Sequence, residues 1–581
     1  MTDPAQKVTF FMVLRWLFTK ALGSTDATGL PNFKQGRARG RLVLAIFVLC
    51  FVTISGRIIQ LAVFDDGFDR IRTSNTAKVR IPRPDIIDRN GFVLATDLRT
   101  GSMFANPRKV NDIDEAIELL SPHLPDLDVA KLRKKLQSDK GFVWVKREVT
   151  PRLQETLHDL GIAGFGFRNE TRRIYPMSRL ASHVLGFVDV DSVGLAGIEK
   201  YLDDRGRLFA ASLADPHKAA AAPVELSLDV RVQHGLTEEL KRAVKKYKAK
   251  GALGIVMDAT TGEVVAASSL PDFNPNDPKD ALKKDRINRF SGGVFEMGSV
   301  FKAVTFAMAF EQRTITLQSR FDVRAPLRAG GSKIDDFHPQ RRILTVPEVF
   351  TYSSNIGTAK MALGVGVDAH QAFLEKMGFF DRLRTEIPEA AAPLRPRKWR
   401  TVSTMTASFG HGISVQPLQL VSAAAALVNG GRLITPTFLK RDRELVASHS
   451  RQVISAETSK KMRYLFRLNV EKGSGRKAET SGFSVGGKTG TAEKVVGGRY
   501  SKKHRFNSFL GAFPMNAPRY VLVVSIDEPQ PLPETHGFAT SGWNAVPTAG
   551  KVIARIAPLL GLRPESEPVA ADSILNARVG G

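Results

Sequence analysis

The chain has 581 residues, a formal net charge of +26 at pH 7 and one cysteine, Cys50. The single cysteine excludes disulfides within the chain and zinc sites built from several cysteines, and the length allows about three or four domains. The charge indicates a solubilising surface or an anionic partner. Because no nucleic-acid recognition motif accompanies it, we expect no nucleic acid, and an anionic envelope polymer or anionic lipid headgroups would fit the charge as well.

The N-terminal region predicts a membrane anchor. Residues 42–56 are uncharged and apolar, a run shorter than the ~20 residues that cross a bilayer. The run reaches Phe64 if the Arg57 side chain extends to the headgroups. No small-residue cleavage site follows it, so we expect an uncleaved single transmembrane helix over 42–64 rather than a signal peptide. Cations before the run and acids after it predict a cytoplasmic arm over 1–41 and an exterior location for the remainder.

Residues 65–222 predict a mixed α+β domain close to the membrane, here called the pedestal. Residues 85–94 have the pattern of two strands joined by an Asn-Gly turn, and helical spacing follows over 112–120 and 126–136. The alanine-rich stretch 210–222 predicts a linker and a domain boundary.

Residues 223–562 predict an α/β domain with an antiparallel sheet flanked by helices. The expected elements, in chain order, are a helix over 229–248, a hairpin over 252–269, a long helix-rich insertion, strands over 484–494, 506–513 and 520–527, and a helix over 546–560. Strands that are split around a helical block, with helices at both ends, are typical of an antiparallel sheet covered by helices. Residues 563–581 are expected to be a disordered tail.

The first chemical motif lies in residues 295–310, which are apolar nearly all round and predict a buried helix with Lys302 as its one cation. Burial disfavours the ammonium form, so the pKa of Lys302 should be lowered and its free amine able to take a proton. Ser299 lies three residues earlier on the same helical face. A serine hydroxyl becomes a good nucleophile beside such a base. Ser-x-x-Lys also occurs by chance, so the burial of Lys302 gives the motif its weight.

The second motif is Ser353-Ser354-Asn355, which falls between two predicted helices on a short connection. Side chains on such a connection can point into a cleft. Ser353 can pass a proton to a leaving amine, and the Asn355 amide can both donate to and accept from a peptide backbone. Taken alone, the same residues are more often a helix cap or a turn.

The third motif, Lys488-Thr489-Gly490, is expected within a strand whose glycines let a ligand approach closely. Lys488 adds a positive charge suited to a substrate carboxylate, and strand alternation puts Thr489 and Thr491 on one face. We expect Thr489, Gly490 and Thr491 to contact substrate, and the N–H groups of Thr491 and Ser299 to form an oxyanion hole. The alternative is a glycine-kinked edge strand with a solvated lysine.

The three motifs in this order resemble the class B penicillin-binding proteins, the membrane-anchored peptidoglycan transpeptidases, and the resemblance covers nearly the whole chain. Asp88-Arg89-Asn90-Gly91 and Arg173-Ile174-Tyr175-Pro176 are similar to signatures of that family. Asn355 in the second motif is closer to the septal, FtsI-type group than to the elongation-type group.

The resemblance implies a D,D-transpeptidase in which Lys302 takes the proton of Ser299. Ser299 then attacks the penultimate D-alanine of a stem peptide. It implies that Ser353, linked to Lys488, passes a proton to the departing D-alanine. Thr489 and Thr491 would bind the carboxylate of that D-alanine. Asn355 would hold the peptide, and β-lactams would acylate Ser299. No metal or other cofactor is implied.

The resemblance also implies a location and partners. The chain would sit in the bacterial inner membrane with its N-terminus in the cytoplasm and its catalytic domain in the periplasm. Its partners would be an FtsW-type glycosyltransferase and other divisome proteins. The alternatives are a D,D-carboxypeptidase, an elongation-type transpeptidase, a β-lactamase and an inactive envelope scaffold. A class A β-lactamase is disfavoured because the chain has no Glu-x-x-Leu-Asn run for deacylation.

Overall fold

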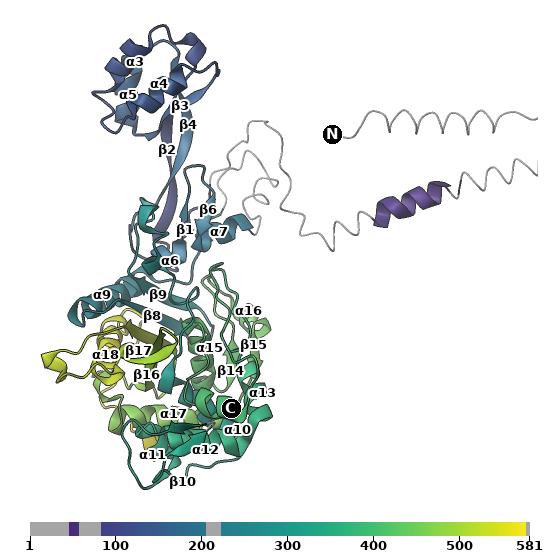
Figure 1. Cartoon of the computed structure of the whole chain (residues 1–581), viewed down its shortest axis with the longest axis vertical. Helices are drawn as coiled ribbons and strands as arrows, with labels where there is room; N and C mark the ends of the chain where they lie inside the picture. The colour runs from purple at the N-terminus through teal and green to yellow at the C-terminus, as the bar shows by residue number, and fades with distance from the viewer. Residues whose placement is uncertain (1–43, 45, 57–82, 205–221, 330, 577–581) are drawn as a thin grey trace, which may run out of the picture. The chain divides into compact units, whose positions relative to one another are not determined.

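A computed structural model describes residues 44, 46–56, 83–204, 222–329 and 331–576 (Figure 1). The chain divides into two compact units, Met1–Arg80 and Ile81–Gly581. In the first unit, residues 44 and 46–56 are helical. Across the described ranges, no helix is both long enough and apolar enough to cross a membrane. The predicted arm and the rest of the 42–64 segment lie outside those ranges, so the transmembrane helix stays a prediction.

Four strands of the pedestal form a five-stranded sheet together with β7, which follows the predicted boundary, and β2 pairs with three of the other strands. Its strands are β1 (Ile86–Ile87), β2 (Val93–Ala105), β3 (Val143–Val149), β4 (Phe165–Ile174) and β7 (Val224–Glu225). Figure 1 shows the helices α3 (Ile113–Leu120), α4 (Val129–Leu136) and α5 (Pro151–Asp159) grouped at one end of the long β2 and β4 strands. The sequence-predicted hairpin and the first two helices are confirmed.

A buried ion network holds the other end of the pedestal, near α6 (Ser182–Leu185), β5 (Phe187–Val188), β6 (Gly194–Ala196) and α7 (Gly197–Asp204). The fully buried Glu199 carboxylate accepts from Arg173 Nε at 2.7 Å and from Arg83 Nε at 2.8 Å. The Tyr175 hydroxyl donates to the same carboxylate at 3.3 Å. Arg173 and Tyr175 are therefore structural residues of the core.

The second domain is built on an antiparallel sheet with strand order β16-β17-β18-β8-β9. The strands are β8 (Gly251–Asp258), β9 (Val264–Leu270), β16 (Gly486–Val496), β17 (Arg499–Phe513) and β18 (Tyr520–Asp527). The helices α9 (Val230–Lys246) and α18 (Ala545–Ile556) cover one face in a common apolar core. This order places β16, which carries the third motif, at an edge of the sheet. The predicted five-stranded sheet is confirmed.

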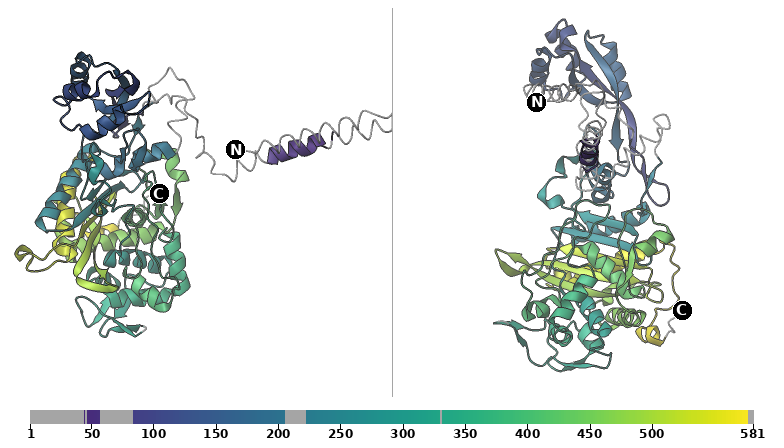
Figure 2. Two further views of the ribbon diagram at one scale, coloured as in Figure 1. Left: turned by 45° about the horizontal axis from the view of Figure 1, so that its top comes forward. Right: turned by 90° about the vertical axis from the view of Figure 1, so that its right-hand side faces the viewer.

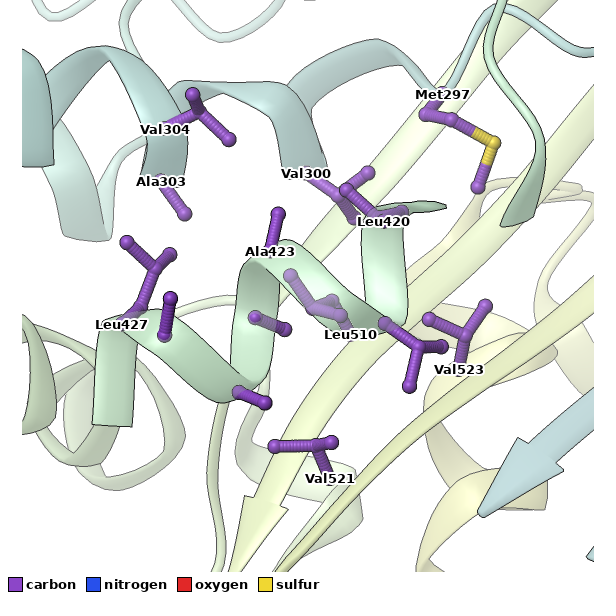
Figure 3. Close-up of a cluster of buried hydrophobic side chains, with 14 of the residues drawn as sticks. Met297, Val300, Ala303, Val304, Leu420, Ala423, Leu427, Leu510, Val521 and Val523 are labelled. Atoms are coloured by element: carbon purple, nitrogen blue, oxygen red, sulfur yellow. The ribbon is translucent and has the colours of Figure 1, made fainter. Parts of the chain in front are cut away.

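The other face of the sheet packs on α15 (Pro417–Val428), as Figure 3 shows. Leu510, Val521 and Val523 approach α15 from the strands, while Val300 and Val304 approach it from its opposite side. Consecutive residues of β18 alternate between the two cores, as the period of a strand requires. The helix α15 therefore lies between the strands β17 and β18 and the side chains of Val300 and Val304.

The insertion between β9 and β16 is rich in helix, as predicted, and most of it gathers on one side of the sheet (Figure 2), whereas its last turn, residues 476–478, packs on α18. Its elements are η3 (Pro278–Asp280), η4 (Lys284–Arg286), η5 (Gly298–Phe301), α10 (Lys302–Glu311), β10 (Arg320–Asp322), β11 (Leu327–Ala329), β12 (Ser332–Ile334), β13 (Ile343–Thr345), α11 (Val346–Thr351), α12 (Asn355–Val365), α13 (Val367–Lys376), α14 (Thr401–Ala407), α15, β14 (Arg432–Ile434), α16 (Arg443–Ser448), β15 (Ser450–Gln452), α17 (Ala456–Lys472) and η6 (Arg476–Ala478).

The tail over 563–576 is ordered, so the prediction of disorder from residue 563 is wrong for this part. Ser484 Oγ donates to the Glu565 carboxylate at 2.5 Å, and Arg467 Nε donates to the Val569 carbonyl at 2.6 Å. The short helix α19 (Ala571–Asn576) packs on α17. Residues 577–581 lie outside the described ranges. The tail is fixed by partners from distant segments, which its own polar, proline-containing sequence does not reveal.

Candidate active site

The two lysines of the first and third motifs meet at the serine of the second. Lys302 Nζ lies 3.0 Å from Ser353 Oγ and also donates to the Ser353 carbonyl. Lys488 Nζ lies 2.9 Å from the same Oγ. Both lysine side chains are fully buried. Segments far apart in the sequence therefore place one hydroxyl between two buried amines.

Burial controls the charge of both amines. It lowers the pKa of Lys302 well below 10.5, and the nearby Lys488 lowers it further, while Asp336 acts in the opposite direction. Burial lowers the pKa of Lys488 to about 7. The structure therefore excludes the alternative in which Lys488 is a solvated lysine of an edge strand. Near neutral pH, this site can hold at least one amine in the free, proton-accepting form.

Ser299 lies in the single 3-10 turn η5, just before α10. The predicted helix over 295–310 therefore begins only at Gly298. Phe295 is extended instead and exchanges two backbone hydrogen bonds of 3.0 Å with Val415. The Ser299 side chain is half-buried, and among the described residues its hydroxyl forms no hydrogen bond with either lysine. It is therefore accessible to a substrate.

Two glycines allow η5 and the edge strand β16 to touch. Gly298 has a φ of +55°, and a Cβ there would lie 2.8 Å from the Thr491 carbonyl oxygen. A Cβ on Gly490 would lie 2.5 Å from the Met297 carbonyl oxygen. Side chains larger than hydrogen would push the turn off the strand. Ser299 and the third motif are thus held together by direct backbone packing.

The second motif joins α11 to α12. Ser353 adopts a φ of +57°, and Ser354 caps α12 by accepting from the Gly357 N–H at 3.0 Å. The buried Asp336 carboxylate accepts from Ser354 Oγ at 2.7 Å, which anchors the turn. Asn355 begins α12 rather than lying on the connection, and its Nδ2 donates to the Asp335 carbonyl at 2.9 Å. No described group hydrogen-bonds to Asn355 Oδ1, so the amide oxygen is the part available to a ligand.

The threonines of β16 contact two serines that no sequence motif indicated. Thr489 Oγ1 lies 2.7 Å from Ser474 Oγ, and Thr491 Oγ1 accepts from the Ser541 N–H at 3.0 Å. Ser474 follows α17, and Ser541 begins the short η8 turn (Ser541–Trp543). These partners come from separate parts of the chain, so only the folded structure could reveal them.

Comparison with known families agrees with this geometry. The model described as "Penicillin binding protein transpeptidase domain" matches residues 252–549, and that described as "Penicillin-binding Protein dimerisation domain" matches residues 78–207. The chain belongs to the penicillin-binding protein transpeptidases. The two matched segments of this penicillin-binding protein correspond to the sheet-containing domain with the three motifs and to the pedestal.

Individual relatives of this penicillin-binding protein are similar along nearly their full length. A probable peptidoglycan D,D-transpeptidase FtsI of Caulobacter vibrioides is 37% identical, covering 97% of this chain and 95% of the relative. A probable peptidoglycan D,D-transpeptidase PenA of Neisseria meningitidis is 33% identical, covering 94% and 96%. The peptidoglycan D,D-transpeptidase FtsI of Escherichia coli is 28% identical, covering 91% and 93%. The aligned regions therefore include both the pedestal and the catalytic domain.

Proposed function

We propose that this penicillin-binding protein is a peptidoglycan D,D-transpeptidase that cross-links stem peptides through an acyl-enzyme on Ser299. The observation that carries the proposal is the Ser353 hydroxyl, which lies within 3.0 Å of both buried amines. A hydroxyl between two amines can relay a proton in either direction. Relatives named as peptidoglycan D,D-transpeptidases, of which one is 37% identical, support the substrate class.

In the proposed acylation step, Lys302 accepts the Ser299 proton as the oxygen attacks the carbonyl carbon of the penultimate D-alanine. The lowered pKa of Lys302, caused by burial, supports this role because it leaves a free amine one turn from Ser299. The N–H groups of Ser299 and Thr491 hold the oxyanion. The contact between Gly298 and the Thr491 carbonyl supports this pairing. One such donor is typically worth ~10²–10³ in rate.

In the leaving-group step, Ser353 passes a proton from Lys302 to the nitrogen of the departing D-alanine. The carboxylate of that residue binds beside Lys488, Thr489 and Thr491. A substrate carboxylate favours the ammonium form of Lys488, so binding should raise the pKa of Lys488 from about 7. Asn355 and Gly490 contact the peptide backbone. An amine of a neighbouring stem then attacks the ester, restoring Ser299 and forming the cross-link.

The decisive experiment uses fluorescent penicillin, because β-lactams should acylate Ser299 and remain attached. Ser299→Ala is expected to abolish labelling. Ser448→Ala, which changes an exposed serine at the end of α16, should leave labelling unchanged. Mass spectrometry of the labelled wild-type chain should place the adduct on the peptide that contains Ser299. Covalent labelling of the Ser299→Ala protein would refute the assignment.

A D,D-carboxypeptidase is the nearest rival because it would form the same acyl-enzyme and pass it to water. Incubation with a stem pentapeptide and an excess of acceptor amine separates the two activities. A transpeptidase should release D-alanine together with an amide product. Release of D-alanine with only hydrolysed peptide would favour the carboxypeptidase.

We also propose that the chain acts at the division septum of the bacterial cell. Residues 42–64 would anchor it in the inner membrane, with 1–41 in the cytoplasm and the domains over 65–222 and 223–562 in the periplasm. The charge asymmetry around 42–56 supports this orientation, and the similarity to FtsI proteins supports the septal role. An FtsW-type glycosyltransferase and other divisome proteins would be its partners. Depletion should yield filaments, whereas rounded cells would favour a role in elongation.

A further inference from the structure

A basic segment between α13 and α14 has no role in the chemistry above. Residues 395–400 read RPRKWR, with four cations and no acid, and are here called the basic strap. All four cationic side chains are exposed, and none forms an ion pair with any described residue. Two exposed arginines elsewhere in the same helical block are paired, since Arg324 lies 2.7 Å from Asp322 and Arg342 lies 2.7 Å from Glu348. The basic strap therefore presents unneutralised charge.

The backbone of the basic strap is fixed at both ends. Leu394, directly before it, exchanges two backbone hydrogen bonds of 2.9 Å with Ser414. Within it, Trp399 Nε1 donates to Thr404 Oγ1 at 2.8 Å. The Arg395 guanidinium lies over the Phe380 ring at 4.3 Å from its centre, which leaves its charge at the surface. An ordered backbone presents the four charges at fixed positions, so a ligand does not have to order the segment on binding.

The basic strap is joined to the framework of the active site. Its neighbour Leu394 pairs with Ser414. Val415, which follows Ser414, pairs with Phe295, and Phe295 lies four residues before Ser299. On its other side the strap leads directly into α14, which packs against α12, the helix that begins at Asn355. A polymer bound to the strap would therefore lie on segments that are connected to the framework of the active site.

We propose that the basic strap is a docking surface for the anionic wall polymer whose stem peptides this enzyme cross-links; this inference rests on the proposed function. Each uncross-linked stem ends in a carboxylate, so a strand presents a series of anions to the four cations. Individual exposed ion pairs are weak, but several on one polymer act together. Docking beside the cleft would raise the local concentration of stems at Ser299. An anionic membrane surface could contact the same charges, but binding there would bring no substrate to the site.

The test compares two double variants of the full-length protein in detergent micelles. Arg397→Gln/Lys398→Gln removes two exposed strap charges whose side chains form no hydrogen bond or ion pair with a described residue. Lys131→Gln/Lys134→Gln removes two exposed charges from α4 of the pedestal and is the matched control. The probe is soluble, uncross-linked peptidoglycan strands at ~0.15 M salt. The strap variant should bind them about three- to tenfold more weakly and show a similarly raised KM, with kcat unchanged. The control should match the wild type.

The penicillin acylation rate should be unchanged in both variants, because neither pair touches the three motifs. Equal strand binding by the strap variant and the wild type would overturn the proposal. An equal loss of strand binding in the strap variant and in the control would also overturn the proposal, since the net charge of the protein would then account for binding. Vesicles of anionic lipid serve as a second probe. If the strap variant bound strands as the wild type does but bound these vesicles more weakly, the strap would be reassigned to a membrane surface. A wild-type protein that binds strands through the strap but is not acylated at Ser299 would refute the proposed function while keeping the docking surface.

Discussion

The buried amine of Lys488 links the stability of the protein to pH. Its pKa is about 7 in the folded protein and near 10.5 in an unfolded chain. Between these two values the unfolded chain binds more protons than the native protein, so stability rises with pH across this range. Below about pH 7 both states hold the proton, and the cost of burying the ammonium is then at its greatest.

Replacing this lysine should therefore stabilise the protein while inactivating it. Lys488→Met keeps a long side chain but removes the buried charge, so we expect the free energy of unfolding at pH 7 to increase by about 1–4 kcal/mol. The increase should be smaller at pH 9.5, where the native amine and part of the unfolded population are neutral. Denaturant unfolding at both pH values measures this. Lys134→Met, at an exposed site on α4, should change stability by less than about 0.5 kcal/mol. A destabilised Lys488→Met protein would contradict the prediction.

The two lysines differ in how far the sequence could predict their environment. The apolar residues on every side of Lys302 predicted its burial, because local sequence supplies most of its surroundings. Lys488 lies in a strand, where alternation leaves the exposure of either face open. Its burial depends on Ser353 and on the Phe350 ring, whose centre lies 5.7 Å from Nζ. Ser474 and Ser541 were unpredicted for the same reason, since long-range packing alone brings them to the threonines.

At the scale of elements, the start of the buried helix that carries Lys302 shows where periodicity fails. The apolar pattern over 295–310 predicted one continuous helix, but the chain is extended at Phe295 and turns at Gly298 into the 3-10 turn η5. A positive φ at Gly298 lies outside the helical range of L-residues, and the contact with Thr491 holds it there. The pattern thus predicted the buried helix, whereas the exact position of Ser299 depends on packing against β16.

A methyl group at this turn should disturb both stability and chemistry. Gly298→Ala adds a Cβ about 2.8 Å from the Thr491 carbonyl oxygen at a φ of +55°. The left-handed conformation alone costs roughly 1–2 kcal/mol for alanine, and the displaced turn should slow penicillin acylation by at least about tenfold. Stopped-flow acylation and thermal unfolding measure the two effects.

The matched control is Gly364→Ala in α12, where a Cβ would meet nothing within 4 Å. That change should stabilise the protein by about 0.5–1 kcal/mol and leave acylation unchanged, because alanine favours a helix interior more than glycine does. Equal acylation rates for the Gly298→Ala protein and the wild type would show that the contact with β16 does not position Ser299.

At the scale of the whole molecule, the pedestal and the catalytic domain share structure within the unit Ile81–Gly581. The predicted boundary at residue 222 is followed at once by β7, which pairs in parallel with β1 of the pedestal. The Asn276 side chain accepts from the Tyr175 N–H and donates to the Tyr175 carbonyl, each at 2.9 Å. The composition change near residue 210 predicts a linker, but composition carries no information about these cross-domain hydrogen bonds.

Asn276 should therefore couple the unfolding of the two domains. Asn276→Ala removes both hydrogen bonds and leaves the backbone groups of Tyr175 unpaired, at an expected cost of about 2–3 kcal/mol. Because Tyr175 also belongs to the ion network of Glu199, the pedestal should loosen first. Calorimetry should then resolve a lower-temperature transition, and limited proteolysis should cleave residues 83–204 sooner.

Asn111→Ala, at an exposed pedestal position, should unfold like the wild type. Penicillin acylation should persist in both variants, because the catalytic contacts lie within the other domain. A single transition at the wild-type temperature in Asn276→Ala would mean that β7 and the remaining contacts hold the domains together without this side chain.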